Sequence, residues 1–511
     1  MHKVLSLVVF ASAIAASAQD NSSAAGILRR SIDALGGEQT LRSIHTVTFK
    51  AVGHHNALEQ SIRPEGPWFV DYQQIQETRD LDQNRLRYEI ESRGYYGEWW
   101  RTAEWQKSAI IVADGVAAQI GADGKPGPGR TAVVQDAEES LALGPERLLL
   151  NALSSKDLNR DVDVTLHGYQ HHVVSFHLNG TAVRILFSPI NDYPAVVELR
   201  RPRPYDTFWS PWGDITTRIS WDLWVMEANG VHYPHQWTYE SNGLPEQTVF
   251  IQDVIFNSDL SAATFDIAAD IKSAAQRRRR TIEEIPFGLP NSPPREVTSG
   301  VWQVPGAWNV EEVRDTNGIV LIEGPLSNSY SAHAIEDAEK RFAPLKVKAV
   351  ITTSDSWPHI GGMREYMAHG IEIYALDLNR SILEKLAAAP HETQSDDLAR
   401  DPKKPKFHLI TTRTLVGNGA TRMEIIPLRT VSGERQMIVY FPESQMLYTS
   451  DLFSKLADGS FWLPQFLQEL KSVVDREHLE VKTIFGMHYE PTPWTEFLRS
   501  LSASSKGQSG K

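Results

Sequence analysis

Residues Ala349–Arg364 read AVITTSDSWPHIGGMR. The apolar start of this stretch predicts a buried strand, and the polar residues from Ser354 onward predict a loop. Gly361-Gly362 then predicts a turn that opens a helix. The stretch therefore predicts a strand, loop and helix in which the polar side chains follow the carboxyl end of a buried strand.

The same alternation continues on both sides of this stretch. Beyond Arg295, we expect strands at 318–323, 349–352 and 371–374, with helices at 333–342 and 361–367 between them. Residues 423–427 and 437–441 return to strand character. Strands that alternate with helices indicate an α/β layered domain, which we place at residues 297–500.

The Ala349–Arg364 stretch resembles the signature of the metallo-β-lactamase fold, which carries Thr-His-x-His-x-Asp-His-x-Gly-Gly. Residues 437–442 with 447–451 resemble the family's strand pair that ends in the bridging aspartate, and residues 486–488 resemble its last histidine motif. Residues 318–325 resemble its early strand, which usually ends near an acidic residue. The resemblance implies an αββα sandwich.

Most of the family's metal ligands are replaced in this chain. Against the motif, Ser354 and Ser356 occupy the first two histidine positions, and Pro358 occupies the aspartate position. The family's middle histidine falls at about Ser432. The ligand positions that keep a metal-binding residue are His359, Asp451 and His488.

Zinc hydrolases need imidazole and carboxylate ligands together with one open position for water. Serine hydroxyls are poor substitutes, so the resemblance does not imply the family's two-metal mechanism. Two histidines and one carboxylate suffice in number for one zinc or ferrous ion, and Asp355 can add a fourth ligand. Asp355 and Glu323 can also support the site.

Two metal-free interpretations stay open. In the first, His359, Asp451 and His488 have structural roles, such as filling a polar pocket or capping backbone groups. In the second, Ser354 or Ser356 forms a Ser-His-Asp set with His359 and Asp355, although sequence proximity does not establish that geometry.

The N-terminus predicts export. Lys3, an apolar run from Val4 to Ala16 and the Ala16-Ser17-Ala18 site indicate a signal peptide at residues 1–18, cleaved between Ala18 and Gln19. No later apolar stretch reaches the roughly 20 residues of a transmembrane helix. We therefore expect a periplasmic or secreted protein, without disulfides because the chain has no cysteine.

Between residues 44 and 269, strand-like segments alternate with polar turns, as in an antiparallel β domain. One segment, residues 214–224, alternates polar and apolar residues. Residues 34–44 and 229–235 resemble periplasmic lipoprotein-carrier half-barrels. The resemblance implies a β half-barrel with a helix over residues 19–270 that binds an apolar ligand.

A linker and a tail complete the predicted organisation. Four arginines at 277–280 and four prolines soon after them predict a linker at residues 271–296, and the Ser/Gly/Lys-rich end predicts a flexible tail at 501–511. The net charge of −13 makes nucleic acid a poor partner.

Two functions therefore follow as hypotheses. The first is an exported, hydrolase-like protein with a depleted metal site, which would cleave an ester, lactone or amide. The second is a non-catalytic pseudoenzyme that binds an apolar ligand, a small molecule or a protein partner.

Overall fold

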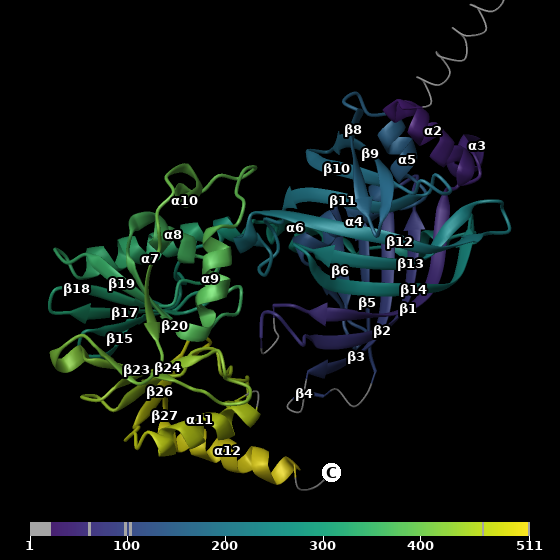
Figure 1. The fold of residues 1–511 in the computed structure, drawn as a ribbon. Coiled ribbons are helices and arrows are strands. Elements are labelled where there is room, and N and C mark those ends of the chain that lie inside the picture. The colour runs from purple at the N-terminus through teal and green to yellow at the C-terminus, as the bar shows by residue number, and fades with distance from the viewer. Residues whose placement is uncertain (1–21, 60–62, 97–99, 102–104, 462–463, 509–511) are drawn as a thin grey trace, which may run out of the picture.

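The computed structural model describes residues 22–59, 63–96, 100–101, 105–461 and 464–508. The expected signal peptide and its cleavage site lie outside the described residues. Figure 1 shows a β-rich N-terminal body beside a C-terminal body in which strands and helices mix. No helix in the described part of the chain is long and apolar enough to cross a membrane.

The N-terminal body is built on one 14-stranded sheet in which all paired strands are antiparallel, so the antiparallel β prediction for this region is confirmed. In space the order is β7-β6-β5-β3-β2-β1-β14-β13-β12-β11-β10-β9-β8, with β4 paired to β3. The strands are β1 (Thr46–Ala57), β2 (Phe69–Asp80), β3 (Arg85–Tyr96), β4 (Trp100–Arg101), β5 (Gln106–Ala113), β6 (Val116–Ile120), β7 (Pro126–Pro128), β8 (Asn159–Leu166), β9 (Tyr169–Leu178), β10 (Thr181–Phe187), β11 (Pro194–Pro202), β12 (Asp214–Met226), β13 (His232–Ser241) and β14 (Leu244–Phe256).

Five helices accompany this sheet: α2 (Ala24–Ala34), α3 (Glu38–Arg42), α4 (Thr131–Leu143), α5 (Leu148–Leu153) and α6 (Ala269–Arg277). Apolar residues of α2, α4 and α5 share one core cluster with the sheet. Helix α6 buries Ile271 and Ala275 against strands β5 and β6. The predicted linker therefore begins inside an ordered helix, because these two apolar residues have a sheet to cover, and its arginines at 277–280 are exposed.

The C-terminal body contains two sheets. The seven-stranded sheet has the order β15 (Arg295–Thr298), β16 (Val301–Val304), β17 (Val310–Asp315), β18 (Gly318–Ile322), β19 (Val347–Thr352), β20 (Glu372–Leu376) and β21 (Lys406–Ile410). The six-stranded sheet has the order β22 (Thr414–Val416), β23 (Met423–Pro427), β24 (Met437–Phe441), β25 (Met446–Tyr448), β26 (Thr483–Gly486) and β27 (Tyr489–Pro493). Strands β18 to β21 run parallel, as do β25 and β26.

Helices cover the faces of these sheets that point away from each other. The helices are α7 (Asn328–Arg341), α8 (Met363–His369), α9 (Arg380–Ala387), α10 (Asp397–Arg400), α11 (Pro464–Arg476) and α12 (Trp494–Gln508). Strand β18 shows why its sequence is apolar throughout: Val320 and Ile322 join the core between the sheets, whereas Ile319 and Leu321 join the core under α7 and α8. A strand buried on both faces needs apolar residues at every position.

Three predicted boundaries differ from the structure. Helix α7 begins at Asn328 rather than 333, because the Ser327 side chain accepts a hydrogen bond from the Tyr330 amide and caps the helix there. Helix α8 begins at Met363, two residues after the expected start. Helix α12 continues to Gln508, so the expected flexible tail is helical up to that residue.

The two bodies contact each other near the Ala349–Arg364 stretch. A 3₁₀ turn, η1 (Ser210–Trp212), places Trp209 and Trp212 edge-on against Trp357, with ring centroids 4.8 and 5.1 Å apart. Arg63 also pairs with Glu434 at 2.7 Å, and Arg435 pairs with Glu65 at 3.3 Å. The N-terminal body thus packs directly on the loop within residues 349–364, which contains Trp357.

A buried ion pair fixes the start of α8. Arg364 binds both carboxylate oxygens of Asp396, at 2.5 and 2.8 Å, and also donates to the Leu386 carbonyl at 2.9 Å. Burial by itself would raise the pKa of Asp396, but Arg364 outweighs it and lowers the pKa to about 2.

We expect Arg364→Met to lower the free energy of unfolding by about 3–5 kcal/mol, because it leaves the Asp396 charge buried without its partner. The stabilisation from Asp396 should be present above pH 4 and lost as the pH falls toward 2, since the folded-state pKa is depressed. Denaturant unfolding at several pH values measures both. Arg380→Met, which removes an exposed pair with Glu384, is the control and should cost less than about 0.5 kcal/mol; equal losses would contradict the prediction.

Candidate functional site

Three of the predicted site residues meet at the carboxyl ends of strands from both C-terminal sheets. His359 lies in the loop after β19, Asp451 follows β25, and His488 follows β26. Because β25 and β26 are parallel, the segments after them emerge at the same edge of their sheet. In layered sheets this edge is where ligands usually bind.

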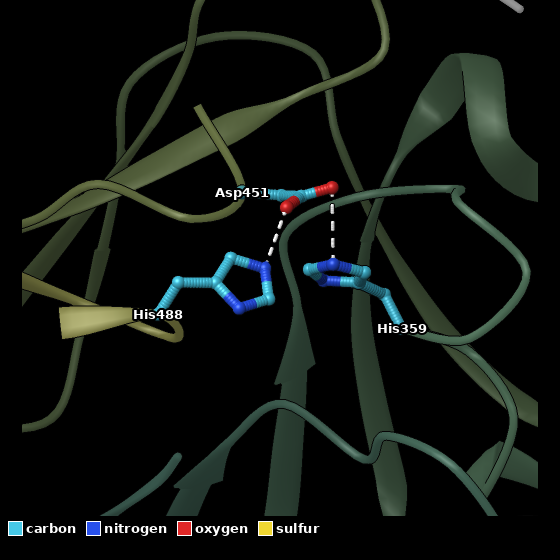
Figure 2. A group of neighbouring side chains, drawn as sticks. All are labelled: His359, Asp451 and His488. Carbon is cyan, nitrogen blue, oxygen red and sulfur yellow. Dashed lines mark hydrogen bonds and ion pairs between the residues drawn. The ribbon is translucent and has the colours of Figure 1, made fainter. Parts of the chain in front are cut away.

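The Asp451 carboxylate lies between the two imidazole rings, as Figure 2 shows. Its Oδ2 is 3.0 Å from Nε2 of His359, and its Oδ1 is 2.8 Å from Nε2 of His488. The three side chains offer ligand atoms that all lie within 4.8 Å of one another. His359 is buried, whereas Asp451 and His488 are each about a quarter exposed or less, so the group is accessible from one side.

The charges of this group reinforce one another. Burial by itself would lower the pKa of His359, but the neighbouring Asp451 carboxylate outweighs it and raises that pKa. Burial would likewise raise the pKa of Asp451, yet the two histidines hold it well below its usual range. The contact between His359 and Asp451 therefore favours the charged form of both groups.

Trp308, in the loop between β16 and β17, covers both histidines. Its ring centroid is 4.9 Å from that of His359 and 5.5 Å from that of His488. The next residue, Asn309, donates hydrogen bonds that fix the backbone beside His488: its amide donates to the Met487 carbonyl and its side chain donates to the Gly486 carbonyl. The sequence did not point to Trp308, since a lone tryptophan in a turn carries no motif.

A buried network holds the backbone that precedes Asp451. The Thr353 hydroxyl contacts both Glu323 and Ser450, and its Oγ1 is 2.6 Å from Oγ of Ser450. Tyr448 donates to Glu323 at 3.4 Å. Burial raises the pKa of Glu323, although the nearby His359 charge lowers it in part. Glu323 thus contacts residues of the backbone segments that carry the site, and it is not one of the three grouped ligands.

The Gly-Gly turn is required by a close approach of two loops. A Cβ on Gly361 would lie 2.5 Å from the Leu326 carbonyl oxygen, and one on Gly362 would lie 2.4 Å from the Ser327 carbonyl oxygen. The amide of Leu326 also donates to the Pro358 carbonyl at 2.7 Å. Only glycine fits at these positions, and the contacts hold the loop that carries His359.

The replaced ligand positions do not add metal ligands. Ser354 is buried, and its Oγ accepts the Ser356 amide at 3.2 Å. The Ser432 amide donates to Glu469 at 3.0 Å. Asp355 is not in the group of His359, Asp451 and His488 within the described residues; burial raises its pKa to about 7, and Arg435 lies near enough to oppose that shift.

The Ser-His-Asp alternative does not match these contacts. His359 Nε2 pairs with Asp451 rather than with Asp355. Its Nδ1 is buried without a hydrogen-bond partner among the residues that the structure describes. The Ser354 hydroxyl accepts the Ser356 amide, and within the described residues the His359 ring has no hydrogen bond to the hydroxyl of Ser354 or Ser356.

A second group of possible ligands lies elsewhere on the surface of the C-terminal body. Glu365 and His369 on α8 and Asp397 on α10 bring their ligand atoms within 4.8 Å of one another. His369 and Asp397 are exposed, and Asp397 already pairs with Arg400. Exposed acidic groups of this kind are common without a bound ion.

The comparisons with known proteins give structural neighbours only. No family model matches the chain, and no curated protein matches it. Solved structures similar to it include the DIM-1 metallo-β-lactamase, with 13% identity over 44% of this chain and 100% of that chain and a TM-score of 0.33. The mono-zinc form of FIM-1 from Pseudomonas aeruginosa has 16% identity over 43% and 98%, with a TM-score of 0.33. The inverting sec-alkylsulfatase Pisa1 from Pseudomonas sp. has 14% identity over 42% and 44%, with a TM-score of 0.31.

We expect Thr353→Val to lower the free energy of unfolding by about 1–3 kcal/mol, because it leaves the buried Glu323 carboxyl group and the Ser450 hydroxyl without their shared partner. Thermal and denaturant unfolding measure the change. Thr411→Val, at an exposed position, is the matched control and should change stability by less than about 0.5 kcal/mol. A Thr353 variant as stable as the control would show that the network does not hold the site.

Proposed function

We propose that residues 297–500 form a metallo-β-lactamase-type αββα domain that holds one divalent metal ion and hydrolyses an ester, lactone or amide. One observation carries the proposal: two imidazole nitrogens lie at 3.0 and 2.8 Å from the two oxygens of a single carboxylate. The proposed ligands, His359, Asp451 and His488, are the three that keep their type in the sequence motif.

The donor set fits a single zinc or ferrous ion. Two imidazoles and one carboxylate are a common ligand set for both ions, and they leave a position open for water or substrate. A second ion has no equivalent set, because Ser354, Ser356 and Ser432 stand at the positions that would bind it. The proposal is therefore a mononuclear site.

Metal binding requires proton loss at this site. Each Nε2 that now donates to Asp451 must lose its proton to become a ligand, so metal uptake competes with the hydrogen bonds from the two rings to Asp451. In most histidine-ligated metal sites the second ring nitrogen donates to a carboxylate or a carbonyl. Nδ1 of His359 has no such partner among the described residues. We therefore expect this site to bind a metal ion more weakly than sites in which that partner is present.

The chain's own residues then have distinct roles. A bound ion of this type supplies Lewis acidity and lowers the pKa of a water molecule to about 7. Asp451 orients both rings, and the Glu323–Thr353–Ser450 network holds the backbone before Asp451. Trp308 covers the two rings and keeps water from that side.

We further propose that the chain is exported to the periplasm or the exterior, with cleavage between Ala18 and Gln19. We also propose an N-terminal domain at residues 19–270, a linker at 271–296 and a tail at 501–511. The signal-like composition of the first 18 residues supports export. The single large sheet with helices beside it supports a lipoprotein-carrier-like half-barrel for the N-terminal domain.

A second candidate function is a non-catalytic binding protein. It is favoured by the serines at the emptied ligand positions and by the missing partner of His359 Nδ1. In this case the group of three would be a structural ion pair, and the strand ends around it would bind a small molecule or a protein partner.

Elemental analysis after dialysis separates the two candidates. We expect the full-length protein to retain about one zinc or iron per chain, and His359→Ala and His488→Ala to weaken metal binding by more than roughly 100-fold, because even partners outside the ligand set cost about 10–100-fold. His369→Ala, which removes a histidine from the second group, is the control and should retain the ion. Metal lost only in the control, or in none of the variants, would refute the proposed ligands.

Activity provides a separate test. We expect the metal-loaded protein to hydrolyse at least one of three test substrates: a chromogenic ester, a lactone and an amide. His488→Ala should abolish this turnover, and His369→Ala should leave it unchanged. A metal-loaded protein without turnover on all three would favour the binding function. Turnover that survives in His488→Ala would contradict the hydrolytic site.

A further inference from the structure

The N-terminal body contains a cavity between helix α4 and one face of the large sheet. Its volume is about 350 Å³, within the range of small-molecule sites. The sheet residues that line it alternate along each strand, as in Glu77 and Arg79 on β2 and in Thr217, Ile219 and Trp221 on β12. Alternate residues of a strand point to one face, so this lining is a continuous surface of the sheet.

The predicted ligand of this body is apolar, but the cavity carries charges. Four carboxylates and three guanidinium groups line it, on Glu77, Asp136, Glu139, Glu246, Arg79, Arg201 and Arg203. A purely apolar ligand would have to cover these groups without replacing their contacts with water, which costs free energy. The occupant must therefore present polar chemistry as well as apolar surface.

The guanidinium groups already have anionic partners. Arg79 donates to Glu77 at 2.6 Å and to Glu146 at 3.1 Å. Arg201 binds both oxygens of Glu139 and donates to Thr217. Arg203 lies 3.7 Å from Glu246. The positive charges of the lining are thus compensated within the protein.

Asp136, on α4, differs from these groups. Its side chain makes no hydrogen bond or salt bridge with any residue that the structure describes, and it is exposed and lines the cavity. Protein atoms nevertheless surround it, and this burial, opposed in part by the charge of Arg203 and helped by that of Glu139, raises its pKa to about 6. A cation placed beside Asp136 would offset the free-energy cost of holding this negative charge among protein atoms.

Aromatic rings form the opposite wall. Tyr88, Trp221, Trp237 and Tyr239 line the cavity from strands β3, β12 and β13. Their faces attract cations, and Arg79 already lies over the Trp237 ring at 5.3 Å. The rings also offer apolar surface to a hydrocarbon body.

From these contacts we propose that the cavity binds a small organic amine with an apolar body, whose ammonium group pairs with Asp136 and whose body lies against the aromatic wall. This site is separate from the histidine group and does not depend on the proposed hydrolase activity. An anionic ligand is the rival, because Arg203 Nε has no hydrogen-bond acceptor among the described residues; the nearby carboxylates of Asp136 and Glu246 disfavour it.

Calorimetric titration with two probes of equal chain length, octylamine and octanoate, tests the proposal on the full-length protein. We expect octylamine to bind saturably and at least tenfold more tightly than octanoate. Asp136→Asn should weaken octylamine binding at least tenfold, because it removes the charge and keeps the shape. Glu138→Gln, at an exposed position on the same helix and outside the cavity lining, should leave binding unchanged.

Three results would overturn the proposal: octanoate that binds more tightly than octylamine, octylamine that does not saturate, or octylamine binding that is equal in Asp136→Asn and wild type. Thermal unfolding checks that the variant is folded. If it is not, the comparison of the two probes on the wild-type protein still decides the sign of the ligand's charge.

Discussion

The carboxylate of Asp451 bonds to side chains that follow strands of both C-terminal sheets. It accepts from His359, which follows a strand of the seven-stranded sheet, and from His488, which follows a strand of the other sheet. A buried imidazole needs such a partner, because an unpaired polar group in a protein interior is costly. One carboxylate thereby joins both sheets at the edge where chemistry would take place.

The N-terminal body also packs against the loop that carries His359. Its Trp209 and Trp212 pack on Trp357, two residues before His359, and Glu65 reaches Arg435, whose charge acts on the buried Asp355. Residues of both bodies therefore contact the loop that carries His359. A change in the N-terminal body can alter the site without touching a ligand.

Local patterns in the sequence predicted much of the C-terminal body, because strands buried on both faces, such as β18 and β24, leave continuous apolar runs. The motif also selected His359, Asp451 and His488 before their geometry was known. Trp308 and the link from Thr353 to Ser450 could not be predicted, since they depend on contacts between segments far apart in the chain. Asp136 likewise carries no local signal, because only the sheet across from α4 makes it part of a cavity.

Diffraction data collected at the zinc absorption edge, on crystals of the protein purified with zinc, test whether the three residues hold a metal ion. We expect one anomalous peak, bounded by His359, Asp451 and His488. A peak at Glu365, His369 and Asp397 instead, or no peak with His359 and His488 still hydrogen-bonded to Asp451, would contradict a surviving metal centre and leave the three residues as a structural ion pair.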